Sequence, residues 1–297
     1  MRPATLAGVG AIALWAFLGL LSRAAAAIPP LQLTAMSFAV AAVLGMAVLA
    51  VRGRLADLRQ PPLAWVHGVG GLFGFHALYF TALAWAPAAE ANLINYTWPL
   101  LIVLLSALLL GLRLTVWHIV GTVLGAAGCV LLLSGGARLT AGALPGYLAA
   151  VASAITWATY SVLSRRFSDV PTGAVAGFCA ASAALAAASH FAVEPTIAPS
   201  LQGWLAVLAM GIGPVGGAFF LWDIGMKRGD PRLLGTLAYA TPVASTLLLC
   251  AGGFAAFSPT LLAAAVLVAA GGLVAARVTP SVSSGRAAPC GPCTGSR

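Results

Sequence analysis

The sequence predicts an all-α integral membrane protein with ten transmembrane helices, arranged as two inverted five-helix repeats with both termini in the cytoplasm. The composition, the apolar runs and a repeated residue pattern lead to this prediction. Of the 297 residues, 61% are hydrophobic and 7% are charged, whereas a soluble domain carries about 25% charged residues. Because water solvates such a surface poorly, the chain belongs in a bilayer.

Ten apolar runs lie between Pro, Gly and Arg residues, and each is close to the roughly 20 residues that a helix needs to cross a bilayer. They are residues 4–22, 31–51, 63–86, 89–111, 116–134, 144–164, 172–192, 202–226, 232–253 and 259–277. The first run has an alternative interpretation as a signal peptide, because Arg2 precedes it and the small residues Ala24 to Ala27 follow it. The repeat described below favours a transmembrane span.

The basic residues predict the orientation of these spans. With ten spans both termini lie on one side of the membrane, and 13 of the 15 Lys and Arg residues fall on that side. Only Arg23 and Arg138 fall on the other side. Since cytoplasmic loops carry an excess of Lys and Arg, both termini are expected in the cytoplasm. The basic residues behind the net charge of +9 are interpreted as signals of membrane orientation, because they form no basic face that could bind nucleic acid.

The two halves of the chain repeat each other at a nearly constant spacing. WAFLGLLSR, residues 15–23, matches WATYSVLSR, residues 157–165, at an offset of 142. Because each repeat holds five spans, an odd number, the second repeat enters from the opposite side and is inverted. We expect repeats at 1–137 and 138–278 and a disordered cytoplasmic tail at 279–297. At an offset of 143, the matches are Gly68, Gly70 and Gly74 with Gly211, Gly213 and Gly217, Tyr96 and Pro99 with Tyr239 and Pro242, and Gly128 with Gly271.

Inverted repeats are typical of secondary transporters, which bind substrate near the bilayer midplane between the two halves. Some channels also contain them. The sequence has no Walker motif for ATP drive and no HExxH, GxSxG or intramembrane acid pair for an enzyme. The ending CGPC, Cys290 to Cys293, spells a redox motif, but its Pro-rich tail lacks the βαβ setting that the motif needs. We expect a transporter without cofactor or metal.

Polar residues gather at the expected midplane in the stretch NLINYTWPLL, residues 92–101. Pro99 and Pro242 lie about 15 Å into their spans at 1.5 Å per residue, and each favours a kink that frees a backbone carbonyl. Asn92, Asn95 and Tyr96 follow the three and four spacing of one helix face, so they are expected to line a cavity. The alternative is that these amides bond across helices as packing contacts.

Aromatic residues at similar depth extend the expected cavity. Trp15, Trp98, Trp157 and Tyr160 lie too deep for the interfacial role of Trp and Tyr. The complete expected substrate-binding set is Trp15, His76, Tyr79, Asn92, Asn95, Tyr96, Trp98, Trp157, Tyr160, Trp222 and Tyr239, with helix kinks at Pro99 and Pro242.

Ionisable residues inside the spans are few. His76 is the deepest, either as a hydrogen-bonding cavity residue or as a proton carrier. Asp223 and Lys227, one turn apart, are expected to form an ion pair. Since no deep acid accompanies His76, we expect facilitated diffusion or weak proton coupling.

The order and placement of these motifs resemble the drug/metabolite transporter superfamily, in particular its ten-helix EamA-type branch of bacterial inner-membrane exporters. WAFLGLLSR opens the first repeat, ALAWAPAAEANLINYTWPLL crosses spans three and four, and KRGDPRLLGTLAYATPV crosses spans eight and nine. HALYF, residues 76–80, and NYTWP, residues 95–99, resemble the aromatic amino-acid exporter group of that branch. The resemblance covers residues 1 to about 278 and implies a multi-pass protein of the bacterial inner (plasma) membrane with a central cavity.

The resemblance also implies a small-molecule substrate, with aromatic and other neutral amino acids as the expected cargo. Indole and phenol faces suit an apolar side chain and an ammonium group, and amides suit a carboxylate. No Arg lies deep enough to clamp a phosphate, so sugar phosphates are not expected. Exporters of other small neutral metabolites or drugs, and a channel, remain alternatives, because a fold does not determine its substrate. We expect a monomer in the lipid bilayer and no nucleic acid partner.

Overall fold

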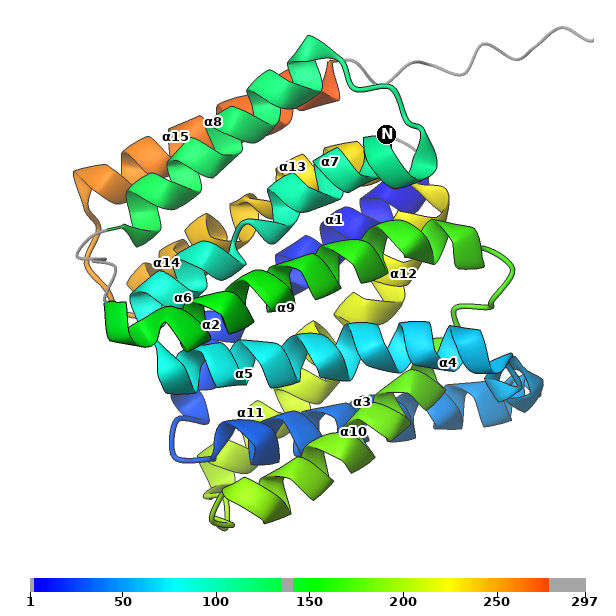
Figure 1. Cartoon of the computed structure of the whole chain (residues 1–297). Helices are drawn as coiled ribbons and strands as arrows, with labels where there is room; N and C mark the ends of the chain where they lie inside the picture. Colours follow the sequence, from blue (N-terminus) through cyan, green and yellow to red (C-terminus); the bar gives the residue numbers. More distant parts are fainter. Residues whose placement is uncertain (1–2, 135–140, 278–297) are drawn as a thin grey trace, which may run out of the picture.

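The computed structural model describes residues 3–134 and 141–277, and every regular element within these residues is helical (Figure 1). Ten segments in the described part are long and apolar enough to cross a membrane, which confirms the predicted number of spans. Predicted and observed ends differ by three residues or fewer. The spans are Pro3–Ala24, Pro30–Val51, Pro62–Trp85, Glu90–Leu110, Val116–Leu133, Leu144–Phe167, Ala174–Val193, Leu201–Arg228, Pro231–Ala251 and Pro259–Ala276.

The expected boundary between the repeats, at residues 137 and 138, lies outside the described residues, and so does the expected tail at 279–297 with Cys290 and Cys293. The helices of the first half are α1 (Pro3–Trp15), α2 (Leu18–Ala24), α3 (Pro30–Val51), η1 (Leu55–Leu58), α4 (Pro62–Val69), η2 (Gly70–Gly74), α5 (Phe75–Trp85), α6 (Ala88–Asn95), α7 (Trp98–Leu110) and α8 (Val116–Leu133). Those of the second half are η3 (Ala141–Ala143), α9 (Leu144–Leu163), η4 (Ser164–Phe167), α10 (Ala174–Val193), α11 (Leu201–Ile212), η5 (Gly213–Gly217), α12 (Ala218–Arg228), α13 (Pro231–Ala238), α14 (Ala240–Ala251) and α15 (Pro259–Ala276).

Spans three and four of the first half and their counterparts, spans eight and nine, are interrupted at matching positions, whereas the break of the first span between Trp15 and Leu18 has no counterpart in α9. The third and eighth spans contain the π-helical segments η2 and η5, with sequences GGLFG and GPVGG that begin 143 residues apart. Each glycine weakens an α-helix by about 1 kcal/mol relative to Ala, so a local change of helix type is tolerated there. The fourth span breaks between Asn95 and Trp98 and the ninth at Tyr239. Pro99 and Pro242 follow these breaks, and neither has the amide hydrogen that a continuous helix needs.

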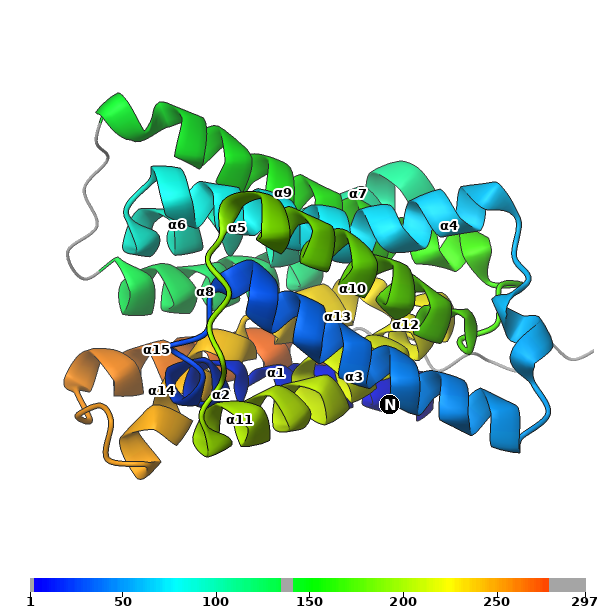
Figure 2. The same cartoon turned by 90° about the horizontal axis from the view of Figure 1, so that it is seen from below.

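The packing of the spans keeps the same pattern when the two halves are exchanged. Each span of three matching pairs contacts its counterpart: α3 packs on α10, α8 on α15, and α7 on α13. Span one packs on span eight through α1 and α12. Exchange of the halves turns this contact into one between span six and span three, which is also present because α9 packs on α5. Figure 2 shows α3 between α10 and α11. Each of these contacts therefore joins a helix of one half to a helix of the other.

The described chain begins and ends at the same end of the bundle, on the right in Figure 1, which we call the terminal end. The connections from α3 to α4, α7 to α8, α9 to α10 and α12 to α13 also lie there. These connections carry most of the described Arg and Lys residues. The opposite end, which we call the far end, holds Arg23 in the last turn of α2.

Side chains are buried unevenly along the bundle. Toward the far end, α2 has no buried residue and α5 has one, Ala82. By contrast, α12, which runs to the terminal end, buries seven of its eleven residues. Thus α12 is packed more closely against its neighbours than α2 and α5.

Candidate functional site

Four tryptophans meet inside the bundle, and we call them the tryptophan cluster: Trp15 of α1, Trp98 of α7, Trp157 of α9 and Trp222 of α12. Every pair is in ring contact, with centroids between 5.0 Å and 6.4 Å apart. The four residues are 1–6% exposed. Trp157 lies ten residues before the end of its span, a depth of about 15 Å at 1.5 Å per residue. The cluster joins two tryptophans from each half at the middle of the bundle.

Two of the four indole N–H groups are used within the protein. Trp15 Nε1 donates to a backbone carbonyl of η5 at 3.0 Å, and Trp222 Nε1 donates to Ser161 Oγ at 3.0 Å. Among the described residues, nothing accepts a hydrogen bond from the N–H of Trp98 or Trp157. Because an indole N–H can only donate, these two groups are available to an acceptor on a ligand.

Other aromatic rings border the tryptophan cluster on the α5 side. Phe219 of α12 lies 5.8 Å from Trp157 and stacks at 5.7 Å on Phe38 of α3. His76 of α5 packs edge-on against Phe38 at 5.1 Å, and its Nδ1 lies 2.7 Å from the Leu72 carbonyl. Since a carbonyl only accepts, Nδ1 carries the hydrogen, and Nε2 of the neutral ring is an acceptor. No described residue bonds to Nε2.

A row of side chains leads from the tryptophan cluster toward the far end. Phe75 lies 5.3 Å from Trp157 and stacks on Tyr79 at 5.9 Å. The Tyr79 hydroxyl donates to the amide oxygen of Asn92 on α6. Phe75, Tyr79 and Asn92 are half-buried. Tyr79 and Asn92 thus form one polar pair next to the cluster.

Tyr160 lies on the terminal side of Trp157, at 5.3 Å, and tilts over the His67 ring at 4.9 Å. It packs directly on η2, where a Cβ at Gly71 would lie 2.2 Å from its ring. The absence of a side chain at Gly71 therefore sets how closely α9 approaches the third span.

Three predicted residues of spans four and nine lie away from the tryptophan cluster. Asn95 accepts a hydrogen bond from Ser153 Oγ of α9 at 2.8 Å, and both residues are buried. This is the packing contact that was the alternative for the amides. Tyr239 is 2% exposed and packs with Tyr96 and Cys129 against α8 and α15. Substrate contacts of Asn95, Tyr96 and Tyr239 stay predictions.

The predicted ion pair between Asp223 and Lys227 is confirmed, and it is buried. Lys227 Nζ lies 2.8 Å from Asp223 Oδ1, and each side chain is 5% exposed. Thr172 Oγ1 donates to Asp223 Oδ2 at 2.6 Å, and Lys227 Nζ donates to the Val170 carbonyl at 2.8 Å. We call these four residues the terminal latch, because they fasten α12 to the connection before α10.

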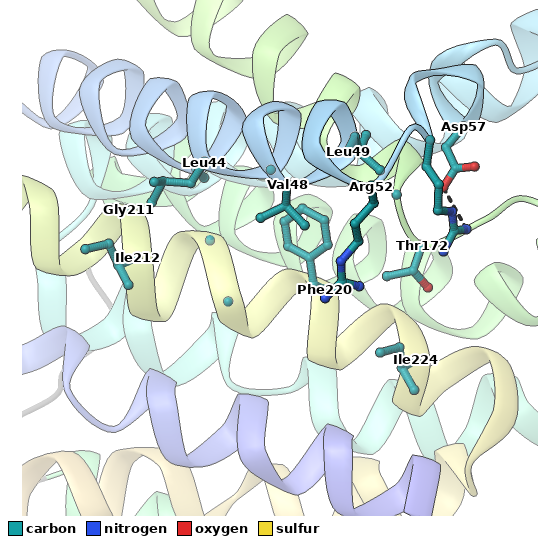
Figure 3. A pocket seen from close by; sticks show the side chains of 16 residues that line it. Leu44, Val48, Leu49, Arg52, Asp57, Thr172, Gly211, Ile212, Phe220 and Ile224 are labelled. Atoms are coloured by element: carbon teal, nitrogen blue, oxygen red, sulfur yellow. Dashed lines mark ion pairs between the residues drawn. The ribbon is translucent and has the colours of Figure 1, made fainter.

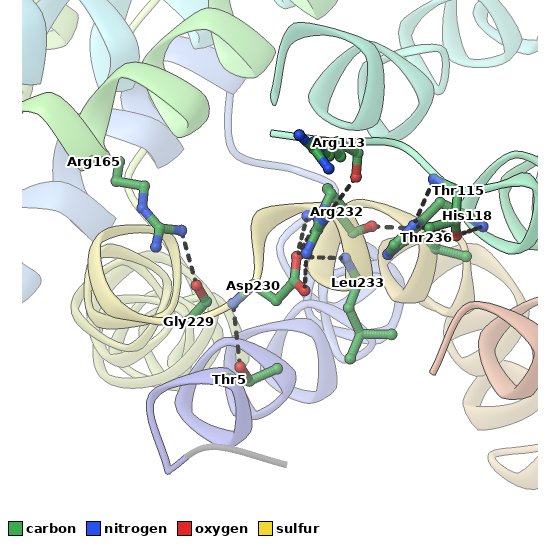
Figure 4. Close-up of polar contacts among 10 residues, drawn as sticks. All are labelled: Thr5, Arg113, Thr115, His118, Arg165, Gly229, Asp230, Arg232, Leu233 and Thr236. Atoms are coloured by element: carbon green, nitrogen blue, oxygen red, sulfur yellow. Dashed lines mark hydrogen bonds and ion pairs between the residues drawn. The ribbon is translucent and has the colours of Figure 1, made fainter. Parts of the chain in front are cut away.

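A second polar network closes the terminal end beside α1 (Figure 4). Asp230 caps α13 and accepts hydrogen bonds from the backbone N and Nε of Arg232, both at 3.0 Å. Its own N–H donates to Thr5 of α1 at 3.2 Å, and Arg232 Nη1 donates to the Arg113 carbonyl at 2.6 Å. Burial raises the pKa of Asp230, but the hydrogen bonds and charge of Arg232 outweigh it, so the pKa lies below its ordinary value.

Phe38, Phe75 and Phe219 lie among the rings beside the tryptophan cluster but are absent from the predicted substrate-binding set. Phenylalanine is an ordinary residue of apolar spans, so its presence alone carries no signal. Helical spacing was the available signal, because Phe75 lies four residues before Tyr79 and Phe219 lies three before Trp222.

The arrangement suits recognition of a small amphipathic molecule. Four indole rings offer apolar and π-electron faces, two unpaired N–H groups offer donors, and one histidine nitrogen offers an acceptor. In the described part of the chain, no three His, Cys, Asp or Glu side chains are grouped to hold a metal ion.

Comparison with known proteins extends this picture. Residues 2–134 and 144–278 each match the EamA-like transporter family. The aromatic amino acid exporter YddG of Ancylobacter novellus is 54% identical over 276 residues, 92% of this chain and 96% of that protein. YddG of Salmonella typhimurium is 27% identical over 262 residues, 83% of this chain and 87% of that protein. A solved crystal structure with 54% identity matches at a TM-score of 0.88, covering 92% of this chain and 96% of that one. These relatives are transporters and not enzymes, and the chain belongs to the EamA-like family of drug/metabolite transporters.

Proposed function

We propose that this protein exports aromatic and other neutral amino acids across the bacterial inner membrane, by alternating access to a cavity lined by the tryptophan cluster. The observation that carries the proposal is the meeting of Trp15, Trp98, Trp157 and Trp222, two from each half, with two indole N–H groups unpaired. The names of the two YddG relatives support this choice of substrate.

The two halves are inverted repeats with cytoplasmic termini in this proposal. The matching interruptions of spans three, four, eight and nine support the repeat, and the packing pattern that survives exchange of the halves supports it independently. Five spans in each half require the copies to run in opposite directions. The excess of basic residues at the terminal end supports a cytoplasmic location for it.

An aromatic amino acid suits the chemistry of the tryptophan cluster and the rings beside it. Its carboxylate accepts from the N–H groups of Trp98 and Trp157, and its ammonium donates to His76 Nε2 and lies over an indole face. Its side chain packs against Phe75 and Phe219. Tyr79, whose hydroxyl donates to Asn92 of α6, lies beside the same rings through its stacking on Phe75.

The conformation is closed at the terminal end in this scheme. The terminal latch is buried, and the Asp230 network ties α13 to α1. Half-buried His76 and Tyr79 lie on the route toward the far end. Substrate therefore leaves through the far end in this state, and breaking the terminal contacts opens the cytoplasmic side.

The coupling is weak or absent in this proposal. Asp223 is already matched by Lys227 within the described residues, so it does not serve as a free proton carrier. These ionisable groups favour facilitated export down the substrate gradient, with proton coupling limited to any proton that His76 carries.

Transport assays with three tryptophan variants test the proposal. We expect purified protein in liposomes to take up labelled tryptophan saturably and other neutral amino acids to compete. Trp98→Phe and Trp157→Phe keep an aromatic ring but remove the indole N–H, and with it a hydrogen bond to a charged group, worth roughly 1.5–3 kcal/mol. The apparent substrate affinity should fall about tenfold or more. Trp204→Phe on the exposed face of α11 is the control and should behave as the parent.

Two results contradict the proposal. Flux of an unrelated neutral solute without any amino acid flux would assign the protein to another substrate. Unchanged amino acid affinity in both Trp98→Phe and Trp157→Phe would remove the indole donors from the binding site.

A further inference from the structure

A groove of about 470 Å³ lies on the outside of the bundle, between α3 and the η5–α12 segment (Figure 3). Its walls are apolar and include Leu44 and Val48 of α3 and Phe220 and Ile224 of α12. Gly211, Gly216 and Gly217 also line it. The groove shares none of its lining residues with the tryptophan cluster.

The groove has the depth of one bilayer leaflet. Along α3 its lining runs from Ala41 to Arg52, which is about 16 Å at 1.5 Å per residue. The hydrocarbon core of a bilayer is about 30 Å thick, so the groove extends from near the midplane to the surface at the terminal end. An acyl chain of a phospholipid in that leaflet covers the same distance.

The mouth of the groove is basic. Arg54 forms an ion pair with Asp57, at 2.9 Å. Arg52 lines the groove and extends beside Phe220 (Figure 3), and no residue in the described chain pairs with its guanidinium. The Thr172 hydroxyl at the mouth already donates to Asp223. A ligand at the mouth therefore meets one unpaired guanidinium.

We propose that this groove binds an anionic phospholipid, with one acyl chain between α3 and α12 and the headgroup phosphate on Arg52. The apolar walls select a lipid over a soluble anion, and the unpaired charge selects an anionic headgroup over a zwitterionic one. Arginine binds phosphate oxygens through two parallel N–H donors, which suits this contact. The site does not depend on the substrate that the protein transports.

Native mass spectrometry of the detergent-solubilised protein tests the site. Phosphatidylglycerol is added in one series, phosphatidylcholine in a second, and inorganic phosphate in a third. We expect phosphatidylglycerol adducts to form at lower concentration than phosphatidylcholine adducts, and inorganic phosphate to form none. Arg52→Gln should weaken phosphatidylglycerol binding about fivefold, the weight of one basic residue at an anionic surface.

Matched controls separate the groove from the general surface. Val48→Trp places a bulky ring in the groove at a half-exposed position and should abolish the preferred adduct. Val43→Trp lies on the same helix but outside the groove, with 64% exposure against 51% for Val48, and should bind as the parent. Arg59→Gln, in the same connection but outside the groove, should also bind as the parent. Equal binding of the two lipids, or parent-like binding by both Arg52→Gln and Val48→Trp, overturns the proposal.

Discussion

Replacing Lys227 by Met is expected to destabilise the closed terminal end strongly. The ammonium sits 2.8 Å from Asp223 Oδ1 with both side chains 5% exposed, so its removal leaves a buried carboxylate without a counter-charge. Loss of one partner of a buried ion pair costs about 3–5 kcal/mol. The Val170 carbonyl also loses its donor. Asp223→Asn should have a similar effect, because it leaves the ammonium buried alone.

The double variant separates the ion pair from general loss of packing. With Asp223→Asn and Lys227→Met together no charge is left buried, so the loss should be smaller than the two single losses added. Contacting residues show interaction energies of about 0.5–3 kcal/mol in such cycles. Thermal unfolding of the four proteins in one detergent measures this, and recovery of each protein from the membrane fraction confirms that it inserts. Additive losses within about 0.5 kcal/mol would refute a coupled latch.

Three further predictions concern the neighbouring elements. Gly71→Ala should lower the unfolding temperature and the transport rate, since overpacking against Tyr160 costs about 1–3 kcal/mol. Gly70→Ala, with open space around its Cβ, should change neither the unfolding temperature nor the transport rate. Equal losses in the two variants would contradict this. Asp230→Asn should lower stability at pH 7. The lowered pKa of Asp230 means that its stabilisation is present above about pH 4 and lost as pH falls further, so the deficit of the variant should shrink by pH 3; a constant deficit would be inconsistent. Tyr79→Phe should reduce transport without loss of membrane insertion, and full transport would exclude the hydroxyl from the route.

The spans could be predicted from the sequence because a bilayer imposes a strict rule. A helix must satisfy all its backbone groups over the full hydrocarbon thickness, so each span leaves an apolar run of known length. The offset of 143 also paired Pro99 with Pro242, which follow the breaks of spans four and nine, since Pro disturbs a helix. The same offset paired glycines of spans three and eight, but the interruptions there were not predicted. The π-helical form of η2 and η5 is not encoded by any simple residue pattern.

The candidate site was only partly predictable. Trp15, Trp98 and Trp157 could be selected as candidates because a deep Trp has no interfacial role, and Trp222 was in the predicted set as an aromatic residue of span eight. The direction in which each helix turns its side chains could not be determined, because lipid-facing and interior residues are both apolar in these spans. Tyr96 and Tyr239 therefore looked equivalent to Trp98, although they pack toward α8 and α15. The Ser153 contact of Asn95 depends on the same unknown rotation.

Counterflow of amino acids in proteoliposomes tests the central claim most directly. Liposomes containing the protein are loaded with unlabelled tryptophan and diluted into a trace of labelled tryptophan without any ion gradient. An alternating-access carrier that releases unlabelled tryptophan outside can bind labelled tryptophan there and carry it inward. The label should therefore accumulate transiently above its equilibrium level. Liposomes loaded with unlabelled phenylalanine in place of tryptophan should give the same overshoot. Passive equilibration of the label without any overshoot would contradict alternating access and indicate a channel.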